Sequence, residues 1–140
     1  AGLFSGRGFN IASLSVGETV DPEISRMTIV VEEDPQTLEQ VVKQLQKMVV
    51  TVKVEDFSSR DIVSSELLLV KFKATASDRS EIMDLVDVYD GDVIDITHST
   101  MTAQFVGDES EIEDILDLLQ PYGIKEVART GTAALAQINP

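Results

Sequence analysis

Residues 101–120 read MTAQFVGDESEIEDILDLLQ, and this stretch contains the pattern that decides the fold. Its first part predicts a strand over residues 101–106. The rest has apolar residues at i, i+3, i+4 and i+7, which predicts a helix over residues 108–120 that buries one face. Asp108 with Glu111 three residues later is typical of a capping box at the start of that helix. The apolar positions are Ile112, Ile115, Leu116 and Leu119.

Two earlier segments, residues 34–48 and 77–89, have the same helical spacing of apolar residues. Each leaves acids and amides on the opposite face, so we expect two further amphipathic helices. The apolar sets are Leu38, Val41, Val42 and Leu45, and then Ile82, Leu85, Val86 and Tyr89. The expected start signals are Asp34-Pro35 and Ser77, and the stop signals after residue 120 are Pro121 and Gly123.

Strand patterns lie between the helices. The segment 11–17 alternates, with Ala12, Leu14 and Val16 on one face, and residues 67–72 are apolar on both faces, as expected of a covered central strand. Residues 93–97 and 101–106 look like a hairpin around Ser99. The strand candidates are residues 11–17, 27–31, 49–54, 67–72, 93–97, 101–106 and 124–129.

The order of these elements predicts an α+β fold made of two ferredoxin-like βαββαβ units. From about residue 63 the order is β-α-β-β-α-β, and the first half reads β-β-α-β after a helical stub at residues 1–6. We therefore expect an incomplete domain over residues 1–56, a polar linker over 57–62 and a ferredoxin-like domain over 63–140. The hairpin over residues 11–31 should keep a bare edge that invites pairing with another chain.

Composition excludes several classes of protein. The formal net charge of −14 with scattered basic residues disfavours nucleic-acid binding and suits a soluble cytoplasmic protein, or one whose partner has a basic patch. The absence of cysteine excludes disulfides, thiolate zinc sites and thiol nucleophiles. No apolar run is long enough to span a bilayer. Because the chain begins with Ala1, we expect its natural start to lie upstream.

The stretch LFSGRGFNI, residues 3–11, is the strongest candidate for a ligand-binding loop. Gly6 and Gly8 allow unusual backbone angles and close approach of a ligand. Asn10 offers an acceptor and a donor, both of which an amino-acid zwitterion needs, and Phe9, Ile11 and Leu14 could supply apolar surface. From the residues alone, a helix cap at Gly8 and a plain turn at Asn10 remain the commoner interpretation.

Other candidates are weaker. His98 is the only histidine and lies at an expected hairpin tip, so an active-site role there is a minor alternative. The acids around residues 84–95 do not have the spacing of a calcium loop. Arg26 could pair with an acid, meet a partner or guard a strand edge. The segment RTGTAALA, residues 129–136, could dock on another surface or fray.

Longer motifs point to a known family. The stretch GLFSGRGFNIASLSVGETVDPEISRMTIVV, residues 2–31, closely resembles the regulatory (small) subunit of acetohydroxyacid synthase, also called acetolactate synthase. The segments LEQVVKQLQKMVVTVKVEDF, residues 38–57, and PYGIKEVARTGTAALAQ, residues 121–137, are similar to the same family. Members of that family begin with a further strand and an N-x-x-G-x-L helix start, so the resemblance implies that the first domain here is truncated.

The resemblance implies an ACT domain, an amino-acid-binding module, in the first half and a related α/β domain in the second. It implies a non-catalytic homodimer that activates a separate catalytic subunit and confers feedback inhibition by valine or another branched-chain amino acid. Thiamine diphosphate, magnesium and FAD would belong to that catalytic subunit, and the location would be cytoplasmic, or organellar in a eukaryote.

By the same resemblance, the loop that lines the effector site contains Asn10 as the likeliest direct contact, with Ile11 and Gly8 as second choices and Phe9 as apolar surface. Two alternatives stay open. The chain could be a stand-alone amino-acid-sensing ACT module, or a small enzyme that uses acids and His98.

Overall fold

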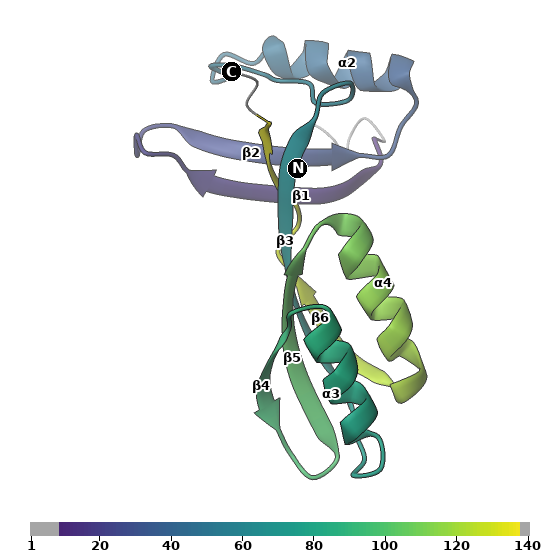
Figure 1. The fold of residues 1–140 in the computed structure, drawn as a ribbon. Coiled ribbons are helices and arrows are strands. Elements are labelled where there is room, and N and C mark those ends of the chain that lie inside the picture. Colours follow the sequence, from purple (N-terminus) through teal and green to yellow (C-terminus); the bar gives the residue numbers. More distant parts are fainter. Residues whose placement is uncertain (1–8, 138–140) are drawn as a thin grey trace. The chain divides into compact units, whose positions relative to one another are not determined.

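The computed structural model describes residues 9–137 and has the expected α+β composition (Figure 1). The helical stub expected at residues 1–6, and Gly8, lie outside the described residues. The elements are β1 (Ile11–Glu18), β2 (Ser25–Val31), α2 (Pro35–Gln46), β3 (Ile62–Lys73), α3 (Arg79–Val88), β4 (Asp92–Ile96), β5 (Thr100–Gly107), α4 (Glu109–Leu119), the short 3₁₀ helix η1 (Gln120–Tyr122), β6 (Ile124–Arg129) and β7 (Ala133–Ala136).

The chain divides into two compact units. The residues before Ser64 form the first unit together with those from Ala134 onward, and Ser64–Ala133 form the second. The return of the last residues to the first unit was not part of the predicted domain boundaries, and the linker assigned to residues 57–62 stays a prediction.

The first unit contains an antiparallel hairpin of β1 and β2 with α2 beside it (Figure 1). The predicted start of α2 is confirmed, because the Asp34 carboxylate accepts a 2.7 Å hydrogen bond from the backbone N–H of Thr37 and Pro35 follows in the first turn. Val41, from the predicted apolar stripe, is 3% exposed. The hairpin pairs Leu14 with Ile29 and Val16 with Met27.

The strand predicted over residues 49–54 is wrong. A turn follows α2, in which the N–H of Thr51 donates to the carbonyl of Met48, and the chain from Thr51 to Val54 has no regular structure. Alternating β-branched residues favour a strand only where the backbone finds a pairing partner, and β1 and β2 pair only with each other within the described residues. Val50 and Val52 are about four-fifths exposed.

The second unit confirms the predicted ferredoxin-like arrangement. The sheet has the order β4-β5-β3-β6, with β3 antiparallel to both of its neighbours, and α3 and α4 lie on one face of it (Figure 1). The hairpin of β4 and β5 around Ser99 is also confirmed. The core between helices and sheet consists of Leu68, Val70, Phe72, Ala74, Ile82, Val86, Met101, Ala103, Phe105, Ile112, Ile115 and Leu119.

Only one face of β3 is covered, which corrects the expectation of a strand buried on both sides. Leu68 and Val70 are fully buried, whereas Leu69 between them is 37% exposed. Consecutive strand residues point to opposite faces, so both helices pack on the side of Leu68. In the run Leu67–Leu69 only Leu68 is in phase with the buried face, and Leu67 and Leu69 lie on the opposite, partly open face of the sheet.

The predicted start and stop signals of α4 are confirmed, whereas the predicted start signal of α3 is wrong. Asp108 and Glu111 form a complete capping box, and Gly123, with φ of 89°, follows η1 in a left-handed conformation. At α3 the N-cap is Asp78 and not Ser77. The hydroxyl of Thr75 donates to the Asp78 carboxylate at 2.9 Å, and this carboxylate makes no capping hydrogen bond to the backbone of α3.

The segment 129–136 neither frays nor extends freely, since its last part forms β7 and pairs with β3. In the described part of the chain, no helix has both the length and the apolar character that crossing a bilayer requires.

Candidate functional site

Asn10 lies where the chain enters β1, opposite the end of β2. Its carbonyl accepts a 2.8 Å hydrogen bond from the N–H of Glu32, which extends the hairpin ladder by one step. The N–H of Asn10 donates to Oε1 of Glu33 at 2.9 Å, and its side-chain amide donates to Oε2 of Glu32 at 3.4 Å. We call Asn10, Glu32 and Glu33 the Asn10 corner.

The other predicted site residues lie beside this corner. Ile11 pairs with Val31 and is half-buried, and the register shifts between Ile11 and Ser13. Phe9 is half-buried as well, whereas Gly8 lies outside the described residues. The register shift between Ile11 and Ser13 is typical of a β-bulge, which bends the strand locally. Such bulges are common beside functional sites.

Sequence reasoning missed the two glutamates of the Asn10 corner. They are 22 and 23 positions away from Asn10, and only the register of the hairpin brings them to it. The side chain of Asn10 is exposed, and the 3.4 Å bond to Glu32 is at the long end of the range for a hydrogen bond. The corner thus presents two carboxylates and a weakly held amide to solvent, a combination that suits a ligand with an ammonium and a carboxylate.

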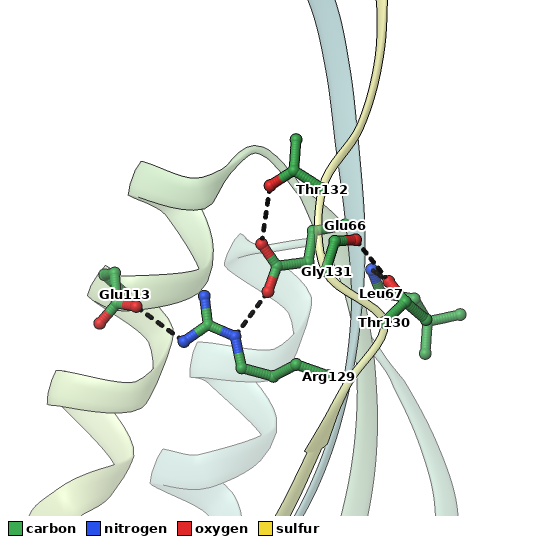
Figure 2. A network of polar contacts seen from close by, with 7 residues as sticks. All are labelled: Glu66, Leu67, Glu113, Arg129, Thr130, Gly131 and Thr132. Atoms are coloured by element: carbon green, nitrogen blue, oxygen red, sulfur yellow. Dashed lines mark hydrogen bonds and ion pairs between the residues drawn. The ribbon is translucent and has the colours of Figure 1, made fainter. Parts of the chain in front are cut away.

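A second polar cluster, in the second unit, is built around Glu66 (Figure 2). Glu66 is 4% exposed, and its Oε1 accepts a 2.5 Å hydrogen bond from Nε of Arg129. Its Oε2 accepts from the hydroxyl of Thr132 at 3.3 Å. A second guanidinium nitrogen of Arg129 donates to Oε1 of Glu113, on α4, at 2.7 Å. We call Glu66, Arg129, Glu113 and Thr132 the Glu66 network.

Thr130 adds backbone contacts to the same place (Figure 2). Its N–H donates to the carbonyl of Leu67 at 3.1 Å, and its hydroxyl accepts from the N–H of Leu67 at 3.0 Å. Gly131 follows with φ of 81°, a conformation that glycine adopts without strain. The chain leaving β6 is therefore attached to β3 by both backbone and side chains.

The carboxylates beside Arg129 raise the pKa of its guanidinium, mainly through the hydrogen bond to Glu66. Glu66 was not predicted as a site residue, although the sequence contains a signal for it. It stands two and four residues before Leu68 and Val70, so it lies in phase with the buried face of the strand. A carboxylate at a core position needs a partner, which Arg129 supplies.

His98 and the acids around residues 84–95 lie on exposed positions of the second unit. The guanidinium of Arg79 donates to the carbonyls of Thr97 and His98, which ties the hairpin tip to α3 through backbone oxygens. The acids around residues 84–95 are on exposed positions of α3, β4 and the turn between them. Among residues 9–137 no group of three or more histidine, aspartate or glutamate side chains is arranged to hold a metal ion.

Among the residues that the structure describes, the hydrogen-bond partner of Arg26 is a backbone carbonyl and not a carboxylate. Its guanidinium donates a 3.1 Å hydrogen bond to the carbonyl of Ala134 in β7, which is 6% exposed. Both residues belong to the first unit. The interaction joins two segments that are 108 positions apart and that no local pattern relates.

The fold defines a class: a two-unit α+β protein whose second unit is ferredoxin-like. The model of the AHAS small subunit-like ACT domain matches residues 1–53, and that of the small subunit of acetolactate synthase matches residues 65–138. The chain belongs to the acetolactate synthase small-subunit family.

Individual relatives agree with this assignment. The chain is 42% identical over 139 residues to the probable acetolactate synthase small subunit of Archaeoglobus fulgidus, covering 99% of this chain and 87% of that one. It is 41% identical over 137 residues to the acetolactate synthase small subunit of Bacillus subtilis, covering 97% and 80%. The crystal structure of the small subunit from Thermotoga maritima superposes with a TM-score of 0.86 at 37% identity, covering 99% of this chain and 86% of that one.

Proposed function

We propose that this chain is the non-catalytic regulatory subunit of an acetolactate synthase, which activates a separate catalytic subunit and makes it sensitive to feedback inhibition by valine. The observation that carries the proposal is the family match over residues 1–53 and 65–138 together. In this proposal the thiamine diphosphate, magnesium and FAD belong to the catalytic subunit, and the protein acts in the cytoplasm.

The Asn10 corner is the proposed contact for the polar end of the amino acid. A zwitterion brings an ammonium, which the carboxylates of Glu32 and Glu33 attract, and a carboxylate, which they repel. The ligand carboxylate would therefore lie on the side of the Asn10 amide. It would accept the hydrogen bond that the side-chain amide of Asn10 now donates to Glu32 at 3.4 Å. The carboxylate of Glu32 would then be free to pair with the ammonium of the ligand. The half-buried Phe9 and Ile11, which precede and follow Asn10 in the chain, are the proposed apolar surface for the side chain of the ligand.

We propose that two copies of the chain pair through the hairpin of the first unit. Leu14, Val16 and Met27 are 42%, 57% and 52% exposed, and the register puts them on one face of β1 and β2. A second copy that covered this face would remove apolar surface from water. Valine that binds the dimer better in the less active state of the enzyme would shift the equilibrium to that state, and a coupling of roughly 1–3 kcal/mol is typical of such control.

The test is reconstitution with a purified acetolactate synthase catalytic subunit of the same organism. Adding the full-length protein should raise the rate of acetolactate formation to a plateau, and valine should then lower that rate. An unchanged rate and the absence of a complex in a pull-down would overturn the proposal. Valine binding by the chain without any complex would indicate the stand-alone amino-acid-sensing module instead.

A further inference from the structure

The connection between α3 and β4 contains Asp90–Gly91, the only place in the sequence where an aspartate is followed by glycine. Asp90 is exposed and lies in the turn after Val88, the last residue of α3. In such a step the backbone nitrogen of the glycine can attack the side-chain carboxyl of the aspartate, because glycine has no side chain that hinders the approach. The step therefore has the chemistry for a spontaneous rearrangement of the main chain.

The rearrangement is a cyclisation followed by a hydrolysis. A bond forms between the nitrogen of Gly91 and Cγ of Asp90, and the amide hydrogen leaves with the carboxyl hydroxyl as water. Water then opens the five-membered imide at one of its two carbonyls. Opening at Cγ restores aspartate. Opening at the backbone carbonyl gives isoaspartate, in which the main chain runs through Cβ and Cγ and is longer by one carbon.

The folded end of α3 holds the nitrogen that must attack. The N–H of Gly91 donates to the carbonyl of Val86 at 2.8 Å, and the N–H of Asp90 donates to the carbonyl of Asp87 at 3.1 Å. This pair of bonds is the Schellman motif, which ends many helices. Asp90 takes its left-handed position, with φ of 53°, where glycine is the usual residue. Cyclisation therefore requires this turn to open.

The folded structure also leaves no room around Gly91. A Cβ built there would lie 2.5 Å from Cε1 of Phe105, a core residue that is 1% exposed, and 3.1 Å from the carbonyl of Gln104. The next residue, Asp92, is the first of β4 and already pairs with Gln104 in β5. A main chain that is one carbon longer before Gly91 cannot keep both the end of α3 and the start of β4 in place.

We propose that Asp90–Gly91 is a site of spontaneous isoaspartate formation, which the folded end of α3 suppresses and whose product does not fit the native connection to β4. Isoaspartate then forms in molecules in which this turn is open. A molecule that carries it has a less stable second unit. The inference does not depend on the regulatory function.

The first experiment measures the rate of isoaspartate formation in the full-length protein, folded and unfolded by guanidinium chloride, at the same neutral pH and temperature. Sodium chloride matches the ionic strength of the folded sample. Isoaspartate is counted by methylation with an isoaspartate-specific methyltransferase and located by peptide fragmentation. Asp90→Gly is the control, since it removes the carboxyl and places glycine at the left-handed position.

We expect the rate at Asp90 to be about tenfold lower in the folded protein, the size expected for a turn closed by two hydrogen bonds. Asp90→Gly should lose the methylation signal of the wild type in both states. Equal rates in the folded and unfolded protein would overturn the claim that the turn protects the site. A signal that stays at the wild-type level in Asp90→Gly would place the reaction elsewhere and would overturn the site itself.

The second experiment tests whether the product fits the fold. Protein aged in the unfolded state is returned to folding conditions, so that molecules with aspartate and with isoaspartate share one sample. A short pulse of protease, at a denaturant concentration just below the unfolding midpoint, removes the less stable molecules. The share of isoaspartate among the survivors should fall about fivefold, as expected when the hydrogen bond from Gly91 to Val86 is lost. An unchanged share would overturn the claim that the product does not fit.

Discussion

Glu66 and Arg129 form a 2.5 Å ion pair in which the carboxylate is 4% exposed and the guanidinium is partly open to solvent. The pair joins positions 63 residues apart, on the neighbouring strands β3 and β6. Since Glu66 takes a core position in β3, the stability of the second unit depends on keeping that charge paired.

Arg129→Met should therefore strongly destabilise the second unit. It leaves the buried carboxylate of Glu66 without its main partner, which typically costs about 3 kcal/mol. The loss should appear in urea denaturation of the full-length protein. Glu113→Gln removes only the more exposed partner of the same guanidinium, and we expect it to cost less than about 1 kcal/mol. Equal effects of the two substitutions would contradict the account of a buried pair.

Gly91→Ala should destabilise the same unit because the site has no room for a methyl group. A Cβ built at Gly91 would lie 2.5 Å from Cε1 of Phe105 and 3.1 Å from the carbonyl of Gln104. Overpacking of this kind costs roughly 1–3 kcal/mol. Gly17→Ala is the matched control, since nothing lies within 4 Å of a Cβ there. Unfolding midpoints that move equally in both variants would contradict the close approach of Gly91 to Phe105.

Two neighbouring leucines test which face of β3 is covered. Leu68→Ala removes a fully buried side chain from the core and should cost roughly 2–5 kcal/mol. Leu69→Ala removes one that is 37% exposed on the opposite face, and it should cost clearly less. The difference is read from the denaturant midpoints of the two variants at equal slope. A larger loss for Leu69→Ala would mean that the face opposite the helices is the buried one.

The cap of α2 gives a prediction about pH. Hydrogen bonds from Thr37 lower the pKa of Asp34 below its ordinary value of 3.8. A carboxyl whose pKa is lowered by folding stabilises the folded state above that ordinary value, and this contribution is lost as the pH falls through the folded-state pKa. NMR titration should show Asp34 titrating below 3.8, and Asp34→Asn should remove this part of the acid sensitivity. Titration at or above 3.8 would contradict the cap.

Most of the fold could be predicted from local patterns. The helix α4 has both a periodic apolar face and the Asp108–Glu111 capping box, so its start and its buried side follow from adjacent residues. The predictions that were wrong depend on distant or competing partners. Residues 49–54 have a strand pattern without a pairing partner among the described residues. At α3, Thr75 engages Asp78, and the helix begins one residue later than expected.

The sites were less accessible to sequence reasoning. Asn10 was singled out as a residue of the right chemistry, but its contacts Glu32 and Glu33 depend on the register of β1 against β2. The sequence leaves Arg26 open to an acid, a partner or a role as guard of a strand edge, and Ala134 is brought to it only by the return of the chain to the first unit. Whether Asn10 contacts an effector stays a prediction.

Inhibition of the reconstituted enzyme by valine, with wild type and with Asn10→Ala, tests the central claim most directly. Each variant's own rate without valine is its reference, and Gln40→Ala, which changes an exposed amide on α2, is the control. We predict that wild type and Gln40→Ala are inhibited alike. Asn10→Ala should need about tenfold more valine for half-inhibition, the effect of one lost hydrogen bond to a charged group. An identical valine response in all three would contradict the account.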